Sequence, residues 1–386
     1  MDEILPKKIK NCFYEKLTFE KILEAHSRSR KNKTYKNEVI KFEMNLENNL
    51  INLLNAVREG KYESGEYRAF VVYEPKERII KALPYVDRIV HQWYVEEFLK
   101  PYIIPKFIDT SYACLEGRGT HKAVETVQRY MQIYKQKYGD YWILKCDISK
   151  FFYSINPDIL YRIMEKHISD KALLEFTRKL VFTGLDGGVG IPIGNYCSQY
   201  FANIYLNELD YYVKQELHVK YYVRYMDDFI LLLENKEQCK EMKKKIEKFL
   251  NENLALKLND KSRYYPSKMG VNFCGYRIFT THRLLRTNSK KKIKANVKKW
   301  NKSYNKNELD IKKVSLQINS WKAHSSHCNS YKLQCKVYDS CEFFYNGVSN
   351  FEKTEKEIIG LIEKYKNRKK KDFKDSEKSV NKKLKK

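Results

Sequence analysis

The sequence predicts an α+β fold in which helices pack behind a sheet. Runs rich in β-branched and aromatic residues, which favour strands, occur at 67–84, 141–148, 222–233 and 268–279. Residues 195–211 and a stretch that carries Cys239, Met242, Ile246 and Phe249 have helical periodicity instead. The order is therefore strand, helices, hairpin, helix and short hairpin, which is typical of α+β chains.

The N-terminal region is expected to begin with helices. Residues 41–60 carry apolar side chains at helical spacing and stop at a glycine. These positions are Leu50, Ile51, Leu54 and Val57, followed by Gly60. A hairpin is predicted next at 67–84, and its second arm carries Lys76, Arg78 and Lys81. Such a basic arm is suited to holding phosphates.

Three further elements are predicted between residues 141 and 211. The run 141–148 reads as a buried strand that ends at Asp147. A helix then opens with Asn156 as N-cap and Pro157 in its first position. The glycine-rich loop 184–194 leads into the helix 195–211, one face of which carries Phe201, Ala202, Tyr205 and Leu209.

Two adjacent acids, Asp227 and Asp228, interrupt the apolar run YVRYMDDFILLL. A hairpin turn accounts for one of them, but like charges so close raise each other's pKa unless a cation lies between them. With Asp147 from another strand they make a hard oxygen site that suits Mg²⁺. Two such ions, about 4 Å apart, activate an attacking 3′-hydroxyl and stabilise a leaving pyrophosphate, which is nucleotidyl transfer.

Composition favours a nucleic-acid partner and excludes a membrane protein. The chain has 75 Lys and Arg against 48 Asp and Glu, a net charge of +27 that attracts phosphates, although an AT-rich genome would also enrich lysine. The 31 tyrosines and 19 phenylalanines offer stacking faces for bases, although most are expected in the core. Nine cysteines without framework spacing, and an N-terminus without an apolar signal region, predict a reduced cytoplasmic protein without disulfides. No apolar run is long enough to span a bilayer.

The C-terminal part changes character from about residue 285, where Lys-rich helical sequence begins. The stretch 364–386 is polar and basic, and reads equally as a solvated tail or as a non-specific nucleic-acid attachment. His324, His327 and Cys328 lack the second paired set that a zinc site needs. We expect Trp321 and its neighbours to pack helices instead.

Several motifs, in order, resemble reverse transcriptases of the prokaryotic group II intron-related lineage. YMDD at 225–228 is similar to the family's Tyr-x-Asp-Asp box, LKCDISKFFYSI to its first metal-binding motif, and LPYVDRIVHQ with SYACLEGRGTHKAV to its finger motifs. NDKSRYYPSKMGVNFCGYRI resembles the late palm and primer-grip motifs. The resemblance covers about 65–285, with weaker similarity to about 333. It implies a right-hand polymerase: a helical extension of the fingers (1–64), fingers and palm with an antiparallel sheet (65–285), a helical basic thumb (286–350) and a Lys-rich C-terminal helix and tail (351–386).

The resemblance also implies roles for single residues. Two Mg²⁺ ions, with Mn²⁺ as an alternative, would be held by Asp147, Asp227, Asp228 and the backbone carbonyl of Ile148. Lys261 would give a proton to the leaving pyrophosphate, while Lys76 and Arg78, helped by Arg118, would grip the incoming triphosphate. Phe152 would stack under the deoxyribose and exclude a 2′-hydroxyl. The substrate site would be completed by Ile193, Gly194, Gln199 and Tyr225. The alternative interpretation of each lysine is a solvated surface charge without a role in catalysis. The alternative for Phe152 is an ordinary core residue of the palm.

One motif departs from most relatives, which have Gln-Gly-x-x-x-Ser-Pro where this chain has IGNYCSQ at 193–199. That variant resembles the enzymes of diversity-generating retroelements, and losing the glutamine amide implies error-tolerant copying. The implied partners are a template RNA, a primer and cDNA strand, dNTPs and a small accessory protein, in a bacterial or phage-encoded system. A phage-defence reverse transcriptase with its own non-coding RNA is the first alternative. A non-catalytic RNA-binding protein on a polymerase scaffold is the second, against which the intact aspartates argue.

Overall fold

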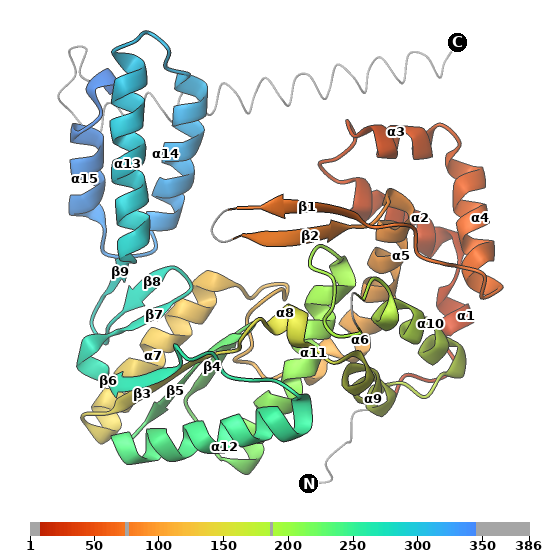
Figure 1. The fold of residues 1–386 in the computed structure, drawn as a ribbon, viewed down its shortest axis with the longest axis horizontal. Coiled ribbons are helices and arrows are strands. Elements are labelled where there is room, and N and C mark those ends of the chain that lie inside the picture. The colour runs from red at the N-terminus through yellow and green to blue at the C-terminus, as the bar shows by residue number, and fades with distance from the viewer. Residues whose placement is uncertain (1–7, 74–76, 186–187, 345–386) are drawn as a thin grey trace. The chain divides into compact units, whose positions relative to one another are not determined.

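The computed structural model describes residues 8–73, 77–185 and 188–344 (Figure 1). The chain divides into two compact units between Cys274 and Gly275. The boundary predicted between palm and thumb, at 285–286, lies a short way beyond this division. Among the described residues, no helix combines the length and the apolar character that crossing a membrane requires.

The first unit begins with helices, as predicted. These N-terminal helices are α1 (Phe13–Lys16), α2 (Phe19–Arg30), α3 (Asn37–Glu43) and α4 (Leu46–Arg58). After the hairpin described next, the chain continues with α5 (Tyr85–Tyr94), a π-helical turn (Val95–Leu99), α6 (Lys100–Tyr102) and a 3-10 turn (Ile104–Lys106). In α4, Leu50, Leu54 and Val57 are buried, and Gly60 follows with a positive φ of 70°. Ile51, however, is 38% exposed, so it does not belong to the core face that the spacing predicted.

The hairpin predicted at 67–84, called the finger hairpin below, is confirmed as β1 (Arg68–Val72) paired with β2 (Arg78–Ala82). The strands are antiparallel, with Arg68 opposite Ala82 and Val72 opposite Arg78. All of β1 is exposed, so this ribbon stands out from the core. Its tip, 74–76, includes Lys76 and lies outside the described residues.

A four-stranded antiparallel sheet forms the centre of the first unit. Its strands are β3 (Trp142–Asp147), β4 (Tyr222–Tyr225), β5 (Asp228–Leu233) and β6 (Arg263–Pro266), in the order β4-β5-β3-β6. The strand that ends at Asp147 and the hairpin around Asp227 are therefore confirmed, whereas β6 was not predicted as a separate strand. A 3-10 turn (Ser267–Met269) and β7 (Val271–Phe273) complete this unit.

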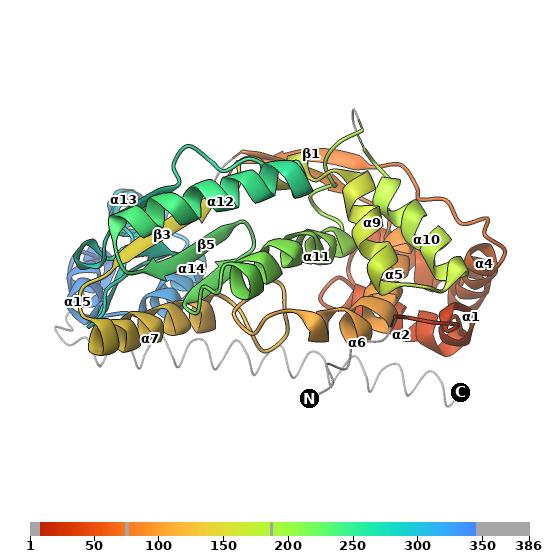
Figure 2. The ribbon, with the colours of Figure 1, turned by 90° about the horizontal axis from the view of Figure 1, so that it is seen from below.

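Helices α7 (Thr120–Tyr138) and α12 (Lys236–Leu254) cover the sheet on its two sides. The other helices of this part of the chain are α8 (Phe151–Ser154), α9 (Pro157–His167), α10 (Lys171–Phe182) and α11 (Tyr196–Tyr211), which a π-helical turn (Tyr212–Glu216) follows, and α9 packs against α10 and α11. Asn156 caps α9, accepting hydrogen bonds from the amides of Asp158 and Ile159, as predicted. Figure 2 shows α12 and α7 on opposite sides of β3 and β5. Leu144 and Leu231 belong to one hydrophobic cluster with α11 and α12.

The second unit has its own small core. Strand β8 (Tyr276–Ile278) pairs with β9 (Arg283–Leu285), and α13 (Thr287–Tyr304), α14 (Ile311–Ser325) and α15 (Tyr331–Asp339) follow. A 3-10 turn (Glu342–Phe344) ends the described chain. Trp321 packs against the cluster of the three helices, as expected. The ring of His324 lies 2.9 Å from the hydroxyl of Tyr276, measured to Nδ1. The predicted tail, 351–386, lies outside the described residues.

Candidate active site

Two of the three predicted carboxylates are direct cross-strand neighbours. Asp147, the last residue of β3, lies opposite Asp228, the first residue of β5. Residues paired in this way point to the same face of a sheet, with Cβ atoms about 4.5–5.5 Å apart. Asp227 precedes Asp228 in the turn that joins β4 to β5. The structure thus brings all three aspartates to one end of the sheet.

The turn that carries Asp227 has an unusual backbone. Only Met226 and Asp227 separate Tyr225 from Asp228, which pair across the hairpin. Met226 has φ of 55°, a conformation that two-residue hairpin turns normally give to glycine, asparagine or aspartate. Such strain persists only where the surroundings hold it. One restraint is the amide of Ile148, which donates to the carbonyl of Asp227 at 3.2 Å.

Burial and charge act together on Asp228. Burial raises its pKa to about 6, and the neighbouring carboxylates of Asp147 and Asp227 push in the same direction. Lys145 opposes them, since its Nζ lies 3.0 Å from Oδ2 of Asp228. The same Nζ donates to the carbonyl of Asn272 at 2.7 Å. Lys145 therefore supplies the positive charge beside Asp228 in this structure.

The chemistry of the site fits a divalent cation. Oδ1 of Asp228 is buried and has no hydrogen-bond partner, a costly state that a cation would relieve. Within the part of the chain that the structure describes, no three His, Cys, Asp or Glu side chains are arranged to hold a metal ion together.

A buried arginine that was not predicted from the sequence holds the hairpin of β4 and β5 against α11. Arg224 has no exposed surface, and its guanidinium forms two hydrogen bonds to Asp210, one of them from Nε at 2.7 Å. It also donates to the carbonyl of Met226 at 3.2 Å and to Oδ1 of Asn203 at 3.1 Å. Tyr222 donates to the same Asp210 at 2.7 Å. Arg224 thus joins the strained turn to the core helix α11.

Three segments far apart in sequence meet through backbone hydrogen bonds. The amide of Lys81 in β2 donates to the carbonyl of Ile193 at 2.8 Å, and the amide of Ile191 donates to the carbonyl of Phe152 at 2.8 Å. At Gly194 a Cβ would lie 2.6 Å from the carbonyl oxygen of Lys81, so only glycine fits there. The finger hairpin, helix α8 with Phe152, and the loop 184–194 with Ile193, called the Ile193 loop below, are therefore joined to one another by backbone hydrogen bonds.

The turn with Lys261 is attached to the backbone of Asp147. The amide of Asn259 donates to the carbonyl of Asp147 at 2.7 Å, and the amide of Asp147 donates to Oγ of Ser262 at 3.1 Å. Lys261 lies between these two anchors and has an exposed side chain. Its position beside the aspartates is therefore fixed through the backbone, and its role as a proton donor stays a prediction.

The remaining predicted residues differ in their surroundings. Arg78, Gly194 and Gln199 are exposed, whereas Phe152, Ile193 and Tyr225 are partly buried. The guanidinium of Arg118 donates to the carbonyls of Ile108 and Ser111, both at 2.7 Å. Through these two hydrogen bonds the side chain of Arg118 stabilises the loop in which it lies. Its proposed contact with an incoming triphosphate stays a prediction.

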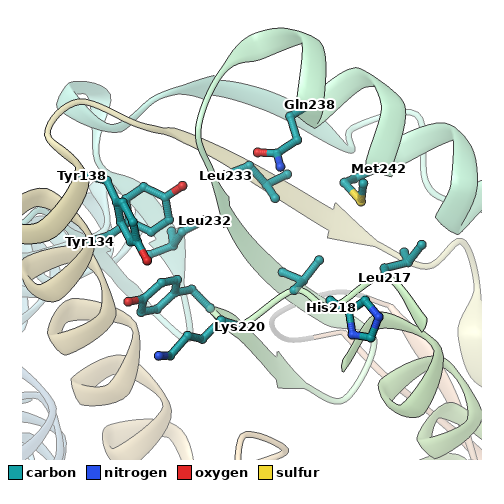
Figure 3. A pocket seen from close by; sticks show the side chains of 11 residues that line it. Tyr134, Tyr138, Leu217, His218, Lys220, Leu232, Leu233, Gln238 and Met242 are labelled. Carbon is teal, nitrogen blue, oxygen red and sulfur yellow. The ribbon is translucent and has the colours of Figure 1, made fainter. Parts of the chain in front are cut away.

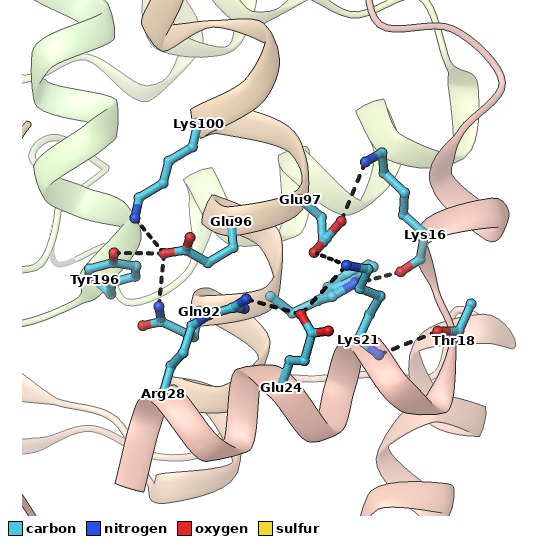
Figure 4. A network of polar contacts seen from close by, with 11 residues as sticks. Lys16, Thr18, Lys21, Glu24, Arg28, Gln92, Glu96, Glu97, Lys100 and Tyr196 are labelled. Atoms are coloured by element: carbon cyan, nitrogen blue, oxygen red, sulfur yellow. Dashed lines mark hydrogen bonds and ion pairs between the residues drawn. The ribbon is translucent and has the colours of Figure 1, made fainter. Parts of the chain in front are cut away.

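A polar network ties the first turn of α11 to the N-terminal helices (Figure 4). Tyr196 donates to Glu96, in the π-helical turn, at 3.2 Å, and Lys100 pairs with the same carboxylate at 2.7 Å. The next residue, Glu97, pairs with Lys16 at 3.4 Å and with Lys21 at 3.3 Å. The start of α11, directly after the Ile193 loop, is thereby attached to the π-helical turn through Glu96, and that turn is in turn paired with α1, α2 and α6.

The comparisons identify the family to which the chain belongs. The model of the family "Reverse transcriptase (RNA-dependent DNA polymerase)" matches residues 74–278, more than half of the chain. The chain therefore belongs to the reverse transcriptase family. That match covers β2, the central sheet with all three aspartates, and the Ile193 loop.

Curated relatives include proteins encoded in group II introns. The chain is 23% identical over 286 residues to a putative COX1/OXI3 intron 2 protein of Saccharomyces cerevisiae, covering 56% of this chain and 31% of that protein. It is 26% identical over 236 residues to protein YkfC of Escherichia coli, covering 50% and 60% respectively. The group II intron-encoded protein LtrA of Lactococcus lactis is 23% identical over 299 residues, with 58% and 49% covered. The chain thus spans between a third and three fifths of the length of these relatives.

Solved structures that are similar to part of this chain include telomerases. The apo telomerase of Candida tropicalis, truncated from its C-terminal domain, has a TM-score of 0.44 and 13% identity over 60% of this chain and 59% of that one. The telomerase of Candida albicans with a fragment of telomeric RNA has a TM-score of 0.42 and 11% identity, covering 62% and 51%.

Proposed function

We propose that this chain is an RNA-directed DNA polymerase that copies an RNA template into cDNA at Asp147, Asp227 and Asp228. The observation that carries the proposal is the cross-strand pairing of Asp147 with Asp228, beside a turn that holds Asp227, in a chain of the reverse transcriptase family. Magnesium-dependent extension of a DNA primer on an RNA template by the purified chain tests it.

The three aspartates would hold two Mg²⁺ ions, or Mn²⁺ in their place, with the carbonyl of Ile148 as a further ligand. When bound, the ions supply activation of the primer 3′-hydroxyl and neutralisation of the charge on the leaving pyrophosphate. Lys145 stays within reach of Asp228 and opposes the rise in the pKa of that carboxylate that burial causes. Lys261 delivers a proton to the pyrophosphate, and Lys76 and Arg78 orient the triphosphate from the finger hairpin.

Phe152 is the proposed sugar gate of this polymerase. Its carbonyl is bonded to the Ile193 loop, and its partly buried ring lies edge to face with Phe151 at 5.7 Å between centroids. We expect Phe152→Val to raise incorporation of ribonucleotides relative to deoxyribonucleotides by about 10- to 100-fold, because the wall against the 2′-hydroxyl is removed. Single-nucleotide extension with each kind of nucleotide measures this ratio. Tyr153→Val, at an exposed neighbour in the same helix, should leave it unchanged. If both variants keep wild-type discrimination, Phe152 is a core residue.

The further proposal is that the copying is mutagenic and serves a diversity-generating retroelement, with a small accessory protein. It is supported by Ile193, a branched apolar residue whose carbonyl accepts a hydrogen bond from the finger hairpin, at the position where the family resemblance implies glutamine. An anti-phage reverse transcriptase that uses its own non-coding RNA is the competing proposal. A template and variable repeat pair beside the coding sequence would favour the retroelement, and its absence would favour defence.

Fidelity tests the role of Ile193. We expect the wild type to misincorporate most heavily opposite template adenines. Ile193→Gln should reduce these errors about two- to tenfold, because one well-placed hydrogen bond contributes about 0.5–1.5 kcal/mol. Sequencing of cDNA made on one defined RNA measures both rates. Val189→Gln, at an exposed position of the same loop, is the matched control. A low, base-independent error rate in the wild type would remove the retroelement proposal.

A further inference from the structure

A second candidate site lies at the other end of the central sheet. A pocket of about 190 Å³ opens there, between α7, the end of β5 and the start of α12 (Figure 3). Leu232, which lines it, is the fourth residue after Asp228 in β5. At about 3.4 Å per residue the two positions are roughly 14 Å apart along the strand. No residue that lines the pocket belongs to the candidate active site.

One wall of the pocket is aromatic. Tyr130, Tyr134 and Tyr138 recur every four residues in α7, a spacing that aligns them on one face of the helix. Tyr221 completes the cluster, with ring centroids 5.1 Å from Tyr134, and Tyr134 lies 4.8 Å from Tyr138. The outermost ring, that of Tyr138, is 50% exposed. A tyrosine cluster that ends in an exposed ring offers a stacking surface with a polar edge.

Cations and a carboxylate both lie near the pocket. Lys220 lines it, with Nζ 5.9 Å from the ring centroid of Tyr221, and Lys137, beside the lining residue Tyr138, has Nζ 5.1 Å from that ring centroid. Burial, and after it the carboxylate of Glu234, raise the pKa of Tyr134. His218, which also lines the pocket, has φ of 52° and follows the π-helical turn Tyr212–Glu216. Strained backbone and π-helical turns are both concentrated at functional sites.

The inner side of the pocket combines apolar contact with one amide. Leu232, Leu233 and Met242 supply apolar surface. Gln238 accepts the amide of Glu234 at 2.8 Å through Oε1, so its Nε2 is the donor that it contributes to the pocket. Figure 3 shows Tyr134 and Tyr138 of α7 on one side of the space and Gln238 with Met242 on the other. The pocket therefore offers stacking, one hydrogen-bond donor and positive charge together.

We propose that this pocket binds one nucleobase of single-stranded RNA, with the adjoining phosphate beside Lys220. A cavity of about 150 Å³ holds a benzene molecule, so about 190 Å³ accommodates a single pyrimidine ring. Aromatic side chains with lysines along the backbone path are the usual means of binding single strands without base-pair readout. The site would hold part of the RNA away from the aspartates while another part is copied.

Binding of a short oligouridylate to the full chain tests the proposal. We use the Asp228→Asn background, so that failure of polymerisation and failure of this site are separate results. Tyr138→Ala should weaken binding at least about fivefold, because stacking on an aromatic ring is lost. Tyr35→Ala is the matched control: Tyr35 is 71% exposed and has Lys36 at 5.4 Å from its ring, but it does not line the pocket. We expect that control to bind like the unsubstituted background.

Two further measurements define the occupant. An oligomer of the same length with abasic sites should not distinguish Tyr138→Ala from the background, and Lys220→Gln should lower the slope of log affinity against log salt by about 0.7. Photo-crosslinks from 4-thiouridine should map to peptides that contain Tyr138 or Tyr221. Equal losses for Tyr138→Ala and Tyr35→Ala, or crosslinks only elsewhere, would overturn the proposal. Uridine monophosphate binding as tightly as the oligomer would assign the pocket to a free nucleotide instead.

Discussion

Asp228→Asn is expected to lower the rate of nucleotide incorporation about a thousandfold or more while RNA binding persists. Asparagine keeps the shape of the side chain but removes the charge that would hold a divalent ion between β3 and β5. Losing several kcal/mol of transition-state stabilisation corresponds to at least three factors of ten in rate. RNA affinity should change by less than about twofold, because it depends on the basic surface of a chain with a net charge of +27.

Asp158→Asn is the matched control for this substitution. Asp158 is exposed, belongs to the same unit, and lies in the first turn of α9 away from the three aspartates. It loses the same charge, so any general electrostatic effect on RNA binding appears in both variants. Single-turnover extension and filter binding measure the two quantities. Incorporation by Asp228→Asn at a rate close to that of Asp158→Asn would contradict the assignment of the aspartates.

Arg224→Met is expected to lower the free energy of unfolding by about 3–5 kcal/mol. The substitution leaves Asp210, which has no exposed surface, as a buried carboxylate without its cation. It also removes the hydrogen bond to the carbonyl of Met226, so the turn that carries Asp227 loses a restraint. Denaturant unfolding followed by circular dichroism measures the loss.

Two variants separate the ion pair from a general effect of losing an arginine. Arg162→Met, at an exposed position of α9, should change the free energy of unfolding by less than about 0.5 kcal/mol. Arg224→Met combined with Asp210→Leu should recover much of the loss, because both buried charges are then absent. If Arg224→Met unfolds like Arg162→Met, the ion pair does not hold the hairpin in place.

The sequence predicts those parts of the fold that local signals determine. The two apolar runs on either side of Asp227 and Asp228 indicate a hairpin, and Asn156 followed by Pro157 marks the start of α9, because both patterns satisfy backbone groups within a few residues. The strand that ends at Asp147 is apolar enough to be recognised alone. Its cross-strand partner, Asp228, lies 81 residues later in the sequence. Their proximity was predicted from the order of the motifs and from the suitability of three carboxylates for binding Mg²⁺.

The parts that were missed depend on long-range contacts. Strand β6 is short and has a proline as its last residue, so only its pairing with β3 makes it a strand. Arg224 and Lys145 lie in otherwise apolar strands. Because a buried charge is costly without a partner, this pattern predicts an acidic partner for each of them. The local pattern does not say which acid that partner is. Asp210 lies in α11 and Asp228 in β5, and only the folded chain brings them to these two cations.

Primer extension by the unsubstituted chain on an RNA template tests the central claim most directly. One DNA primer is annealed to an RNA template and to a DNA template of the same sequence, with Mg²⁺, with Mn²⁺, and with a chelator. We predict cDNA synthesis on RNA that requires the divalent ion and is lost in Asp228→Asn. Absence of any incorporation under all ion conditions, by a folded chain that still binds the RNA, would contradict the claim and favour a non-catalytic RNA-binding protein.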